Sequence, residues 1–408
     1  MKNNYIRYTL VAVITITALL LSIQPTQAQW TQAQSFSIGK VNAISSKGST
    51  VFAGTDTGGV YISTDFGYSW TEKNVGLSNK NISAIIQKDT VVILGVSGFG
   101  AAVFVSKDQG DTWDVPTSPY SGYLFCMVEQ GNNLLAGTWF GVAKSTDNGD
   151  TWATLPTTGL PSNASVTALF AKGDTIFAGV SSSSVGGEGI FRSTDNGTTW
   201  VNKSTGITNT NFTSMAQSGN KLIATVSGGD GVYISTNNGD SWTAANNGLS
   251  GLGVNALFVS GSNILVGTQN GVFLSKDTAS SWIAINAGLP TNTSVTSVAT
   301  NGHFLLIGTD STVWRRPTAE VITSVPSVVN DRVSIYPNPS RGVFTIELLD
   351  ETEAQAISIT NAVGQVVYTS SIITNNPLKL NLENTPQGVY SIQIKTTKGL
   401  INHRIILE

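Results

Sequence analysis

Short apolar segments separated by Gly- and Asn-rich turns recur along most of the chain. Units begin at intervals of 41 to 46 residues, with first segments starting at Val41, Ile82, Leu124, Val166, Phe212, Val254 and Val295. Each unit continues with a second segment such as VFAGT (51–55) and a third such as VYIS (60–63), and six units have a fourth that begins at a tryptophan. Four short strands in every forty-odd residues predict one blade of a β-propeller.

The turn before the fourth segment carries a repeated motif, Ser-x-Asp-x-Gly-x-x-Trp. Its six copies comprise Ser63, Asp65, Gly67, Trp70; Ser106, Asp108, Gly110, Trp113; Ser145, Asp147, Gly149, Trp152; Ser193, Asp195, Gly197, Trp200; Ser235, Asn237, Gly239, Trp242; and Ser275, Asp277, Trp282. A short Asp side chain can accept N–H groups of its own turn, Gly supplies positive φ, and Trp can pack on the neighbouring sheet. We therefore expect a structural role for these residues. Asn237 still suits such a turn, whereas Ala279 stands where the other copies have Gly, and we expect Ala279→Gly to stabilise the protein.

The seventh unit lacks a fourth segment, because VWRR (313–316) is followed by Pro317. Gln29-Trp30-Thr31 is similar to the fourth-segment starts Trp70-Thr71 and Trp242-Thr243, and it leads into the segment at Val41. We expect residues near 30–37, with Trp30, to complete the last blade and close the ring, which removes exposed sheet edges. The predicted fold class is all-β: a seven-bladed β-propeller closed by an N-terminal strand, followed by a small Ig-like β-sandwich.

Four regions are predicted along the chain. Residues 1–28 have the features of a signal peptide, with Lys2 and Arg7, an apolar stretch, and cleavage after Ala28. The apolar stretch is short for a membrane span, so we expect no stable span in the mature chain, and an uncleaved anchor is the alternative. The propeller is assigned to 29–316, a linker to 317–331, and a second domain to 332–408, where period-two alternation in LKLNLEN (378–384) predicts strands.

The second domain resembles a known export signal. YPNPSRGVFTIEL (336–348), ITNAVGQVVY (359–368) and PQGVYSIQIKTTKGLINHRIIL (386–407) resemble the C-terminal sorting domain of type IX secretion cargo. The residues that carry the motifs are Tyr336, Pro337, Asn338, Pro339, Gly342, Gly364, Gly388 and Tyr390. The resemblance implies the type IX secretion machinery as a partner, transit of a Gram-negative periplasm, and a secreted or surface-attached product. An ordinary Ig-like stalk is the alternative.

The six turn motifs resemble the Asp-box, or BNR, repeat of sialidases, sortilin-type receptors, xyloglucan-cleaving glycosidases and photosystem assembly factors. The resemblance implies that the motif lies away from the catalytic or binding face. A sialidase needs a cluster of arginines for the substrate carboxylate. Arg192, Arg315 and Arg316 lie on predicted third strands, two of them adjacent, so we do not expect them to converge as bidentate clamps.

Composition excludes several other functions. Charged residues are 12% of the chain and the net charge is −3. The sequence contains no basic patch, so we do not expect nucleic-acid binding. Cys126 is the sole cysteine and is expected to be a buried, inert thiol. His303 is the sole histidine of the repeats, and the GGDG run at 228–231 lacks the spaced acids of a calcium loop. We therefore expect neither a metal nor a cofactor.

Aromatic and acidic residues in the loops are the remaining candidates. Phe99, Tyr120, Tyr123, Trp139 and Phe140 lie in or near loops of the second and third units. Exposed aromatics among small polar residues are typical of glycan or protein contacts, although packing of Trp139 between blades is an equal alternative. The function predicted from sequence is non-catalytic binding or scaffolding of an extracellular glycan or protein. A glycoside hydrolase is the alternative, using loop carboxylates that include Asp56, Glu188, Asp230 and Asp310.

Overall fold

The computed structural model describes residues 29–33, 39–100, 102–116, 121–181, 188–321 and 333–407, the last range without 339, 349–353, 362–363, 372–376 and 397–398. The chain divides into two compact units, Met1–Thr323 and Ser324–Glu408. Within the described ranges the regular structure is β, as predicted, apart from a short 3₁₀ helix, η1 (Thr318–Glu320). Among the described residues no helix has the length and apolarity needed to cross a membrane.

The first unit consists of small antiparallel sheets whose strands follow chain order, except that the last sheet takes its fourth strand, β1, from the start of the unit. The first strands are β2 (Val41–Lys47), β6 (Ile82–Lys88), β9 (Leu124–Gln130), β13 (Ser165–Lys172), β17 (Phe212–Ser218), β21 (Val254–Ser260) and β25 (Val295–Thr300). The second strands are β3 (Thr50–Thr55), β7 (Val91–Val96), β10 (Asn133–Thr138), β14 (Thr175–Ser181), β18 (Lys221–Val226), β22 (Asn263–Thr268) and β26 (Phe304–Thr309). The third strands are β4 (Val60–Ser63), β8 (Val103–Ser106), β11 (Gly141–Ser145), β15 (Gly189–Ser193), β19 (Val232–Ser235), β23 (Gly271–Ser275) and β27 (Val313–Pro317). The fourth strands are β5 (Thr71–Glu72), β12 (Ala153–Thr154), β16 (Val201–Asn202), β20 (Thr243–Ala244), β24 (Ile283–Ala284) and β1 (Thr31–Gln32).

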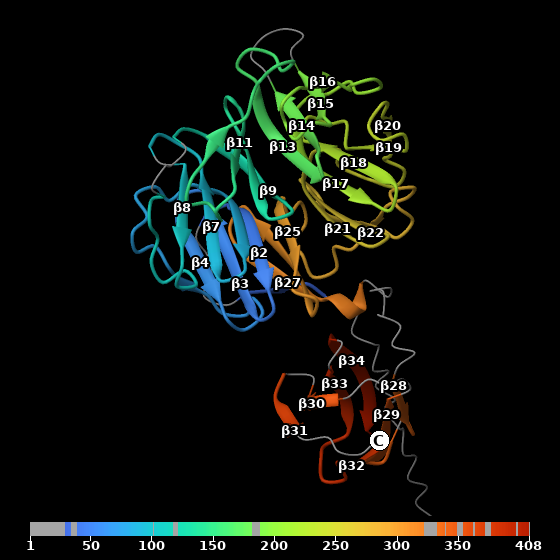
Figure 1. Cartoon of the computed structure of the whole chain (residues 1–408). Coiled ribbons are helices and arrows are strands. Elements are labelled where there is room, and N and C mark those ends of the chain that lie inside the picture. Colours follow the sequence, from blue (N-terminus) through green and yellow to red (C-terminus); the bar gives the residue numbers. More distant parts are fainter. Residues whose placement is uncertain are drawn as a thin grey trace, which may run out of the picture. The chain divides into compact units, whose positions relative to one another are not determined.

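These sheets form a closed ring. Each first strand contacts the first strand of the next sheet, and β25 contacts β2, so the sheets surround a common centre (Figure 1). The second sheet, β6-β7-β8, has no fourth strand among the described residues, and Asp114 makes only an isolated bridge to Val105. The first unit also extends past Arg316 into the expected linker, because Val321 is 4% exposed and packs in the core of the last sheets.

The second strands are almost completely buried, because each is covered on both faces by neighbouring sheets. Each has five consecutive buried residues, from Val51–Thr55 in the first sheet to Leu305–Thr309 in the last. Sheets approach closely where the second strand carries glycine: a Cβ on Gly137 would lie 2.4 Å from the Val166 oxygen and 2.6 Å from Cys126 Sγ. Cys126 is partly buried and not fully buried as expected, and desolvation raises the pKa of its thiol to about 12, which favours an unreactive thiol.

The six repeat turns, which are the Ser-x-Asp-x-Gly-x-x-Trp segments, share one hydrogen-bond network. In the third turn, the Ser145 hydroxyl donates to Asp147 Oδ1 (2.8 Å) and accepts from the Gly149 N–H (2.9 Å). The Asp147 carboxylate also accepts from the backbone N–H and the hydroxyl of Thr151. Every turn has Ser or Thr at the Thr151 position, directly before the tryptophan, and each of these residues bonds the Asp or Asn side chain.

The tryptophans link each sheet to the preceding one. All six are less than 9% exposed. The indole of Trp242 donates to the Lys203 carbonyl (2.9 Å), and that of Trp282 donates to the Ala245 carbonyl (2.7 Å). Trp113 and Trp200 make equivalent bonds, whereas the indoles of Trp70 and Trp152 bond within their own turns.

Trp30 occupies the same position in the last sheet. Its indole donates to the Ile285 carbonyl (2.7 Å), its backbone N–H donates to Ala287, and the side chain is 2% exposed. Strand β1 then pairs with β27, placing Thr31 opposite Arg315. Gly288, at φ +91°, leaves room for this strand, because a Cβ there would lie 2.7 Å from the Trp30 oxygen. The segment that follows, 34–38, lies outside the described residues.

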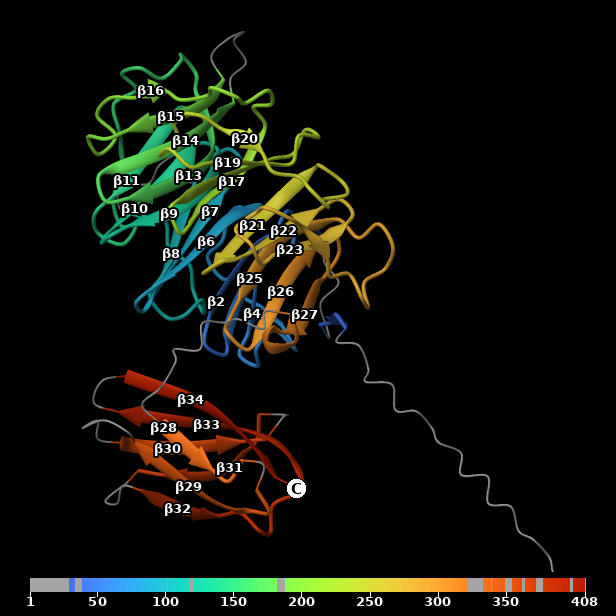
Figure 2. The same cartoon turned by 90° about the vertical axis from the view of Figure 1, so that its right-hand side faces the viewer.

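The second unit consists of two antiparallel sheets around one core (Figure 2). One sheet has the order β28 (Val333–Tyr336), β29 (Val343–Leu348), β32 (Leu378–Asn381). The other has the order β31 (Val366–Ser370), β30 (Ala354–Thr360), β33 (Gly388–Thr396), β34 (Gly399–Leu407). The period-two pattern matches the burial, because Tyr390, Ile392 and Ile394 are buried in the core and Val389 is 47% exposed.

Candidate functional site

The ring has two faces because turns alternate between the two ends of an antiparallel sheet. We call the end with the repeat turns and the first-to-second-strand turns the turn face. The opposite end, with the second-to-third-strand turns and the connections between sheets, is the loop face. The predicted aromatic and acidic candidates that are described all lie in segments of the loop face.

Four aromatic rings from three loop-face segments form one cluster, which we call the aromatic cluster. Phe99 and Tyr123 have ring centroids 5.8 Å apart, Tyr123 and Trp139 4.9 Å, and Phe125 and Trp139 6.3 Å. Backbone bonds fix the segments, because the Trp139 N–H donates to the Tyr123 carbonyl (3.2 Å). Such offset and edge-on geometries are the favoured ones for aromatic pairs. The cluster is therefore a connected structure shared by the second and third sheets.

Much of the aromatic cluster faces solvent. The Phe99 side chain is 91% exposed and Trp139 is 43% exposed, while Tyr123 and Phe125 are partly buried beneath them. Phe140, in the same turn as Trp139, is 57% exposed and joins none of these ring contacts. Three predicted residues thus come together, and Phe125, which was not predicted, joins them through its contact with Trp139. Tyr120 lies outside the described residues.

Two of the predicted acidic residues, Glu188 and Asp230, lie on the loop face of the fourth and fifth sheets. Both are bonded to one short connection: Thr208 Oγ1 donates to Asp230 Oδ2 (2.7 Å) and Thr210 Oγ1 donates to Glu188 Oε2 (2.6 Å). The Tyr233 hydroxyl also donates to Asp230 (3.0 Å). The carboxylates are therefore neighbours on the same face, and each has a defined orientation.

The turn face carries inter-sheet contacts that sequence reasoning missed. Each repeat turn receives a cationic side chain from the preceding sheet. The contacts are Arg315 over the Tyr68 ring (4.6 Å), Lys73 with Asp111 (2.5 Å), Lys107 with Asp150 (3.0 Å), Lys144 with Asn196 (3.1 Å), Arg192 and Lys203 with Asp240 (3.1 and 2.7 Å), and Lys221 with the Thr278 carbonyl (3.1 Å). Isolated surface pairs are worth little, so these contacts orient neighbouring sheets more than they stabilise them.

The arginines that a sialidase would need are dispersed and already engaged. Arg192 bonds the Asn238 carbonyl (2.7 Å) and Asp240, while Arg315 lies between the rings of Tyr68 and Phe304. Arg316, which is adjacent to Arg315, donates to the Ile285 carbonyl (3.0 Å). Three guanidinium groups in separate structural contacts do not form a carboxylate clamp.

In the second unit, the predicted motif residues shape strand ends and turns. The Asn338 side chain donates to the Arg404 carbonyl (2.8 Å) and accepts from the Ile406 N–H (3.0 Å), so it pairs with the edge of β34 as a neighbouring strand would. Tyr336 donates to Glu347 (3.0 Å), a bond that raises the pKa of the tyrosine, and Tyr390 donates to the Pro386 carbonyl (2.6 Å). Pro339 lies outside the described residues, while Pro337 is described and exposed. Three motif glycines have positive φ: Gly342, Gly364 and Gly388.

Solved structures with a similar fold are β-propellers. YCF48 bound to a D1 peptide aligns with 71% of this chain and 96% of its own, at 13% identity and a TM-score of 0.56. The GH74 xyloglucanase from Xanthomonas campestris aligns over 73% of this chain, at 18% identity and a TM-score of 0.56. The extracellular domain of the hybrid two component system BT4673 from B. thetaiotaomicron aligns over 92%, at 16% identity and a TM-score of 0.59. The chain spans about half the length of the last two proteins, 55% and 52%.

These likenesses establish the fold of the first unit as a β-propeller and nothing about its ligand. No curated protein matches the chain in sequence. Residues 334–408 match the family of secretion system C-terminal sorting domains. The second unit is accordingly a C-terminal sorting domain, which indicates export by the type IX secretion system to a secreted or cell-surface location.

Proposed function

We propose that the protein is an exported, non-catalytic β-propeller that binds or scaffolds an extracellular glycan or protein through the aromatic cluster. In this proposal residues 1–28 are a signal peptide, a seven-bladed Asp-box propeller closed by Trp30 begins at residue 29, and 332–408 form an Ig-like sorting domain. The propeller includes Val321, so the connection between the domains is the remainder of the predicted linker, 317–331. The observation that carries the proposal is the contact of the exposed rings of Phe99 and Trp139 with the ring of Tyr123 on the loop face.

The free-energy cost of exposing ordered aromatic rings to water supports the proposed binding surface. Large apolar side chains that remain exposed and ordered on a soluble protein are typical of contact surfaces. Contact between the rings has already restricted the Tyr123 and Trp139 side chains, so ordering them costs little when a ligand binds. A sugar ring or an apolar side chain can pack on the exposed faces of Phe99 and Trp139, with Phe140 beside them.

Glycoside hydrolysis is the second candidate, and the paired acids favour it. Glu188 and Asp230 accept hydrogen bonds from Thr210 and Thr208, so two carboxylates contact the same connection on the loop face. Hydrolases of glycosides use two carboxylates about 5–10 Å apart. The bonds from Thr208 and Tyr233 to Asp230 are equally consistent with a structural role in which both acids fix loops.

The full chain should be tested against immobilised neutral and acidic glycans. Tyr123→Ala combined with Trp139→Ala is expected to abolish binding while leaving the unfolding transition of the ring intact, and Glu188→Gln is expected to leave binding unchanged. Binding that survives in the double variant contradicts the aromatic site. Release of reducing ends from a bound polysaccharide, lost in Glu188→Gln or Asp230→Asn, would establish the hydrolase instead.

A further inference from the structure

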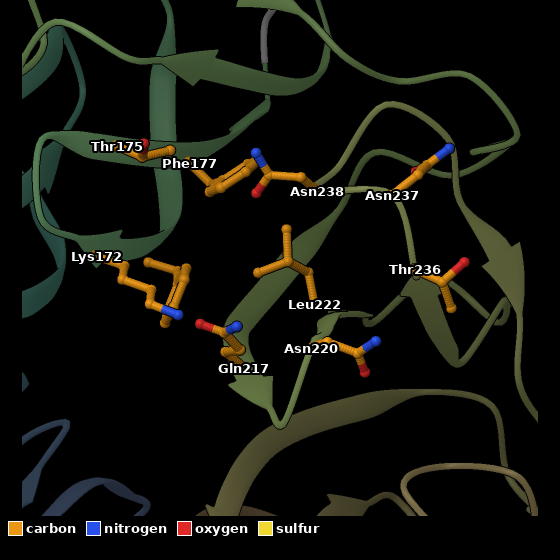
Figure 3. A pocket seen from close by; sticks show the side chains of 10 residues that line it. Lys172, Thr175, Phe177, Gln217, Asn220, Leu222, Thr236, Asn237 and Asn238 are labelled. Atoms are coloured by element: carbon orange, nitrogen blue, oxygen red, sulfur yellow. The ribbon is translucent and has the colours of Figure 1, made fainter.

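A cleft of about 320 Å³ opens on the turn face between the fourth and fifth sheets. Its walls come from β13, β14 and their turn on one side and from β17, β18 and the fifth repeat turn on the other. Figure 3 shows Leu222 in the middle of the view, with Asn238 above it and Gln217 below. The volume lies at the lower end of the range of small-molecule sites, about 300–1,000 Å³.

The walls combine amides with aromatic rings. Gln217, Asn220 and Asn238 contribute side-chain amides, and an amide can both donate and accept hydrogen bonds. The amide of Asn237 also lines the cleft, but it is bonded to Ser235 and Ser241 within the repeat turn. Within the described part of the chain, the side-chain amides of Asn220 and Asn238 have no hydrogen-bond partner in the protein. Gln217 uses its Nε2 on the Gly219 carbonyl (2.8 Å), which fixes the side chain and leaves the oxygen available.

Two phenylalanines in a tilted ring contact contribute to the apolar part of the cleft. Phe177 is 1% exposed and is packed beneath the repeat turn, where a Cβ on Gly239 would lie 2.4 Å from its ring. The partly buried Phe170 lies beside it, with ring centroids 6.4 Å apart. Phe170 therefore offers a supported apolar surface next to the amides.

The repeat turn that borders the cleft differs in charge from the other five repeat turns. Five of the six turns carry a carboxylate at the Asp position, and the turn that borders the cleft carries Asn237 instead. The neighbouring Asp240 is neutralised by Lys203 and Arg192. Among the residues that line the cleft, Lys172 is the one charged side chain, and an ammonium group can donate to hydroxyls as well as to anions.

We propose that this cleft is a second ligand site, independent of the aromatic cluster, and that it binds one ring of a neutral saccharide. Several hydroxyls around an apolar ring face match amides that donate and accept beside a phenylalanine surface. Because the cleft lies on the turn face and the aromatic cluster on the loop face, a chain with both sites could contact two glycan segments at once.

The test is a saturation-transfer NMR titration of the full chain with cellobiose, lactose and maltose, and with glucuronate as an acidic probe. At least one neutral disaccharide is expected to bind saturably. Gln217→Ala combined with Asn220→Ala should weaken that binding about tenfold, as expected for the loss of two neutral hydrogen bonds. Asn132→Ala, at the equivalent exposed position of the third sheet, is the matched control and should bind as the parent does.

Three results would overturn the proposal. They are failure of all three disaccharides to bind, equal affinity in the double variant and the parent, or binding of glucuronate alone, which would assign the cleft to anions through Lys172. Trp139→Ala separates the two sites, because disaccharide binding that is lost in this variant belongs to the aromatic cluster and not to the cleft.

Discussion

The two faces of the ring differ in how their side chains are used. On the turn face, the same Ser, Asp and Trp positions recur, and their polar atoms are engaged in the bonds of the turns. On the loop face the segments differ in length and composition, and aromatic rings remain exposed. Repetition therefore marks the residues that hold the ring together, and divergence marks the residues available for recognition. The cleft beside Asn237 follows the same rule, because it lies where one repeat turn departs from the pattern.

The sharpest test of this difference compares two tryptophans. Trp30→Ala is expected to lower the free energy of unfolding by about 3–5 kcal/mol, because it removes a buried ring and a hydrogen bond that closes the last sheet. Trp139→Ala, on the loop face, is expected to change it by less than about 1 kcal/mol. Equilibrium denaturation of both variants measures the contrast. Equal losses of unfolding free energy in the two variants would contradict the role of Trp30 in closing the ring.

The next effect tests the buried serine of a repeat turn. Ser145→Ala leaves the buried Gly149 N–H without its acceptor and removes a donor to Asp147, so we expect a loss of about 1–3 kcal/mol. Ser121→Ala, at an exposed position of the loop face, is the control and should change stability by less than about 0.5 kcal/mol. A Ser145 variant as stable as the control would show that the shared network contributes nothing.

Acid should weaken the turn face before the loop face. Hydrogen bonds from the Thr112 hydroxyl and N–H lower the pKa of Asp108 to about 2, and Thr199 does the same for Asp195. Because an unfolded Asp has a pKa near 3.9, this stabilisation is complete above about pH 4 and is lost as the pH falls through about 2. Urea unfolding at pH 5, 3 and 2 should show a smaller fall in Asp108→Asn than in the parent. Asn237→Asp should enlarge that fall, and parallel curves would contradict the assignment.

The strands and turns that repeat could be predicted from the sequence, whereas the contacts that depend on packing between sheets could not. The all-β class, the strand order and the position of Trp30 follow from periodicity and from one similar tripeptide. The Ser or Thr before each tryptophan, such as Thr151, was visible in every copy and was overlooked. The Lys73–Asp111 contact and the addition of Phe125 to the aromatic cluster could not be read from sequence, because they join residues whose distance is set by packing between sheets.

The smallest effect concerns the repeat turn that carries Ala279 in place of glycine. Ala279 keeps the turn geometry at φ +68°, and its N–H still donates to Ser275 (2.9 Å). Ala279→Gly relieves backbone strain of about 1–2 kcal/mol and loses a fully buried methyl worth about 0.8 kcal/mol, so we expect a net gain below about 1 kcal/mol.

Gly239→Ala is the matched reverse change, and it should destabilise the protein by about 1–3 kcal/mol, because its Cβ would meet Phe177 at 2.4 Å. Melting temperatures of both variants measure the pair. An unchanged or lower value for Ala279→Gly would show that the cluster around Ile223 and Trp282 needs the methyl more than the turn needs glycine. In that case the departure at Ala279 would be an adaptation of packing between the fifth and sixth sheets.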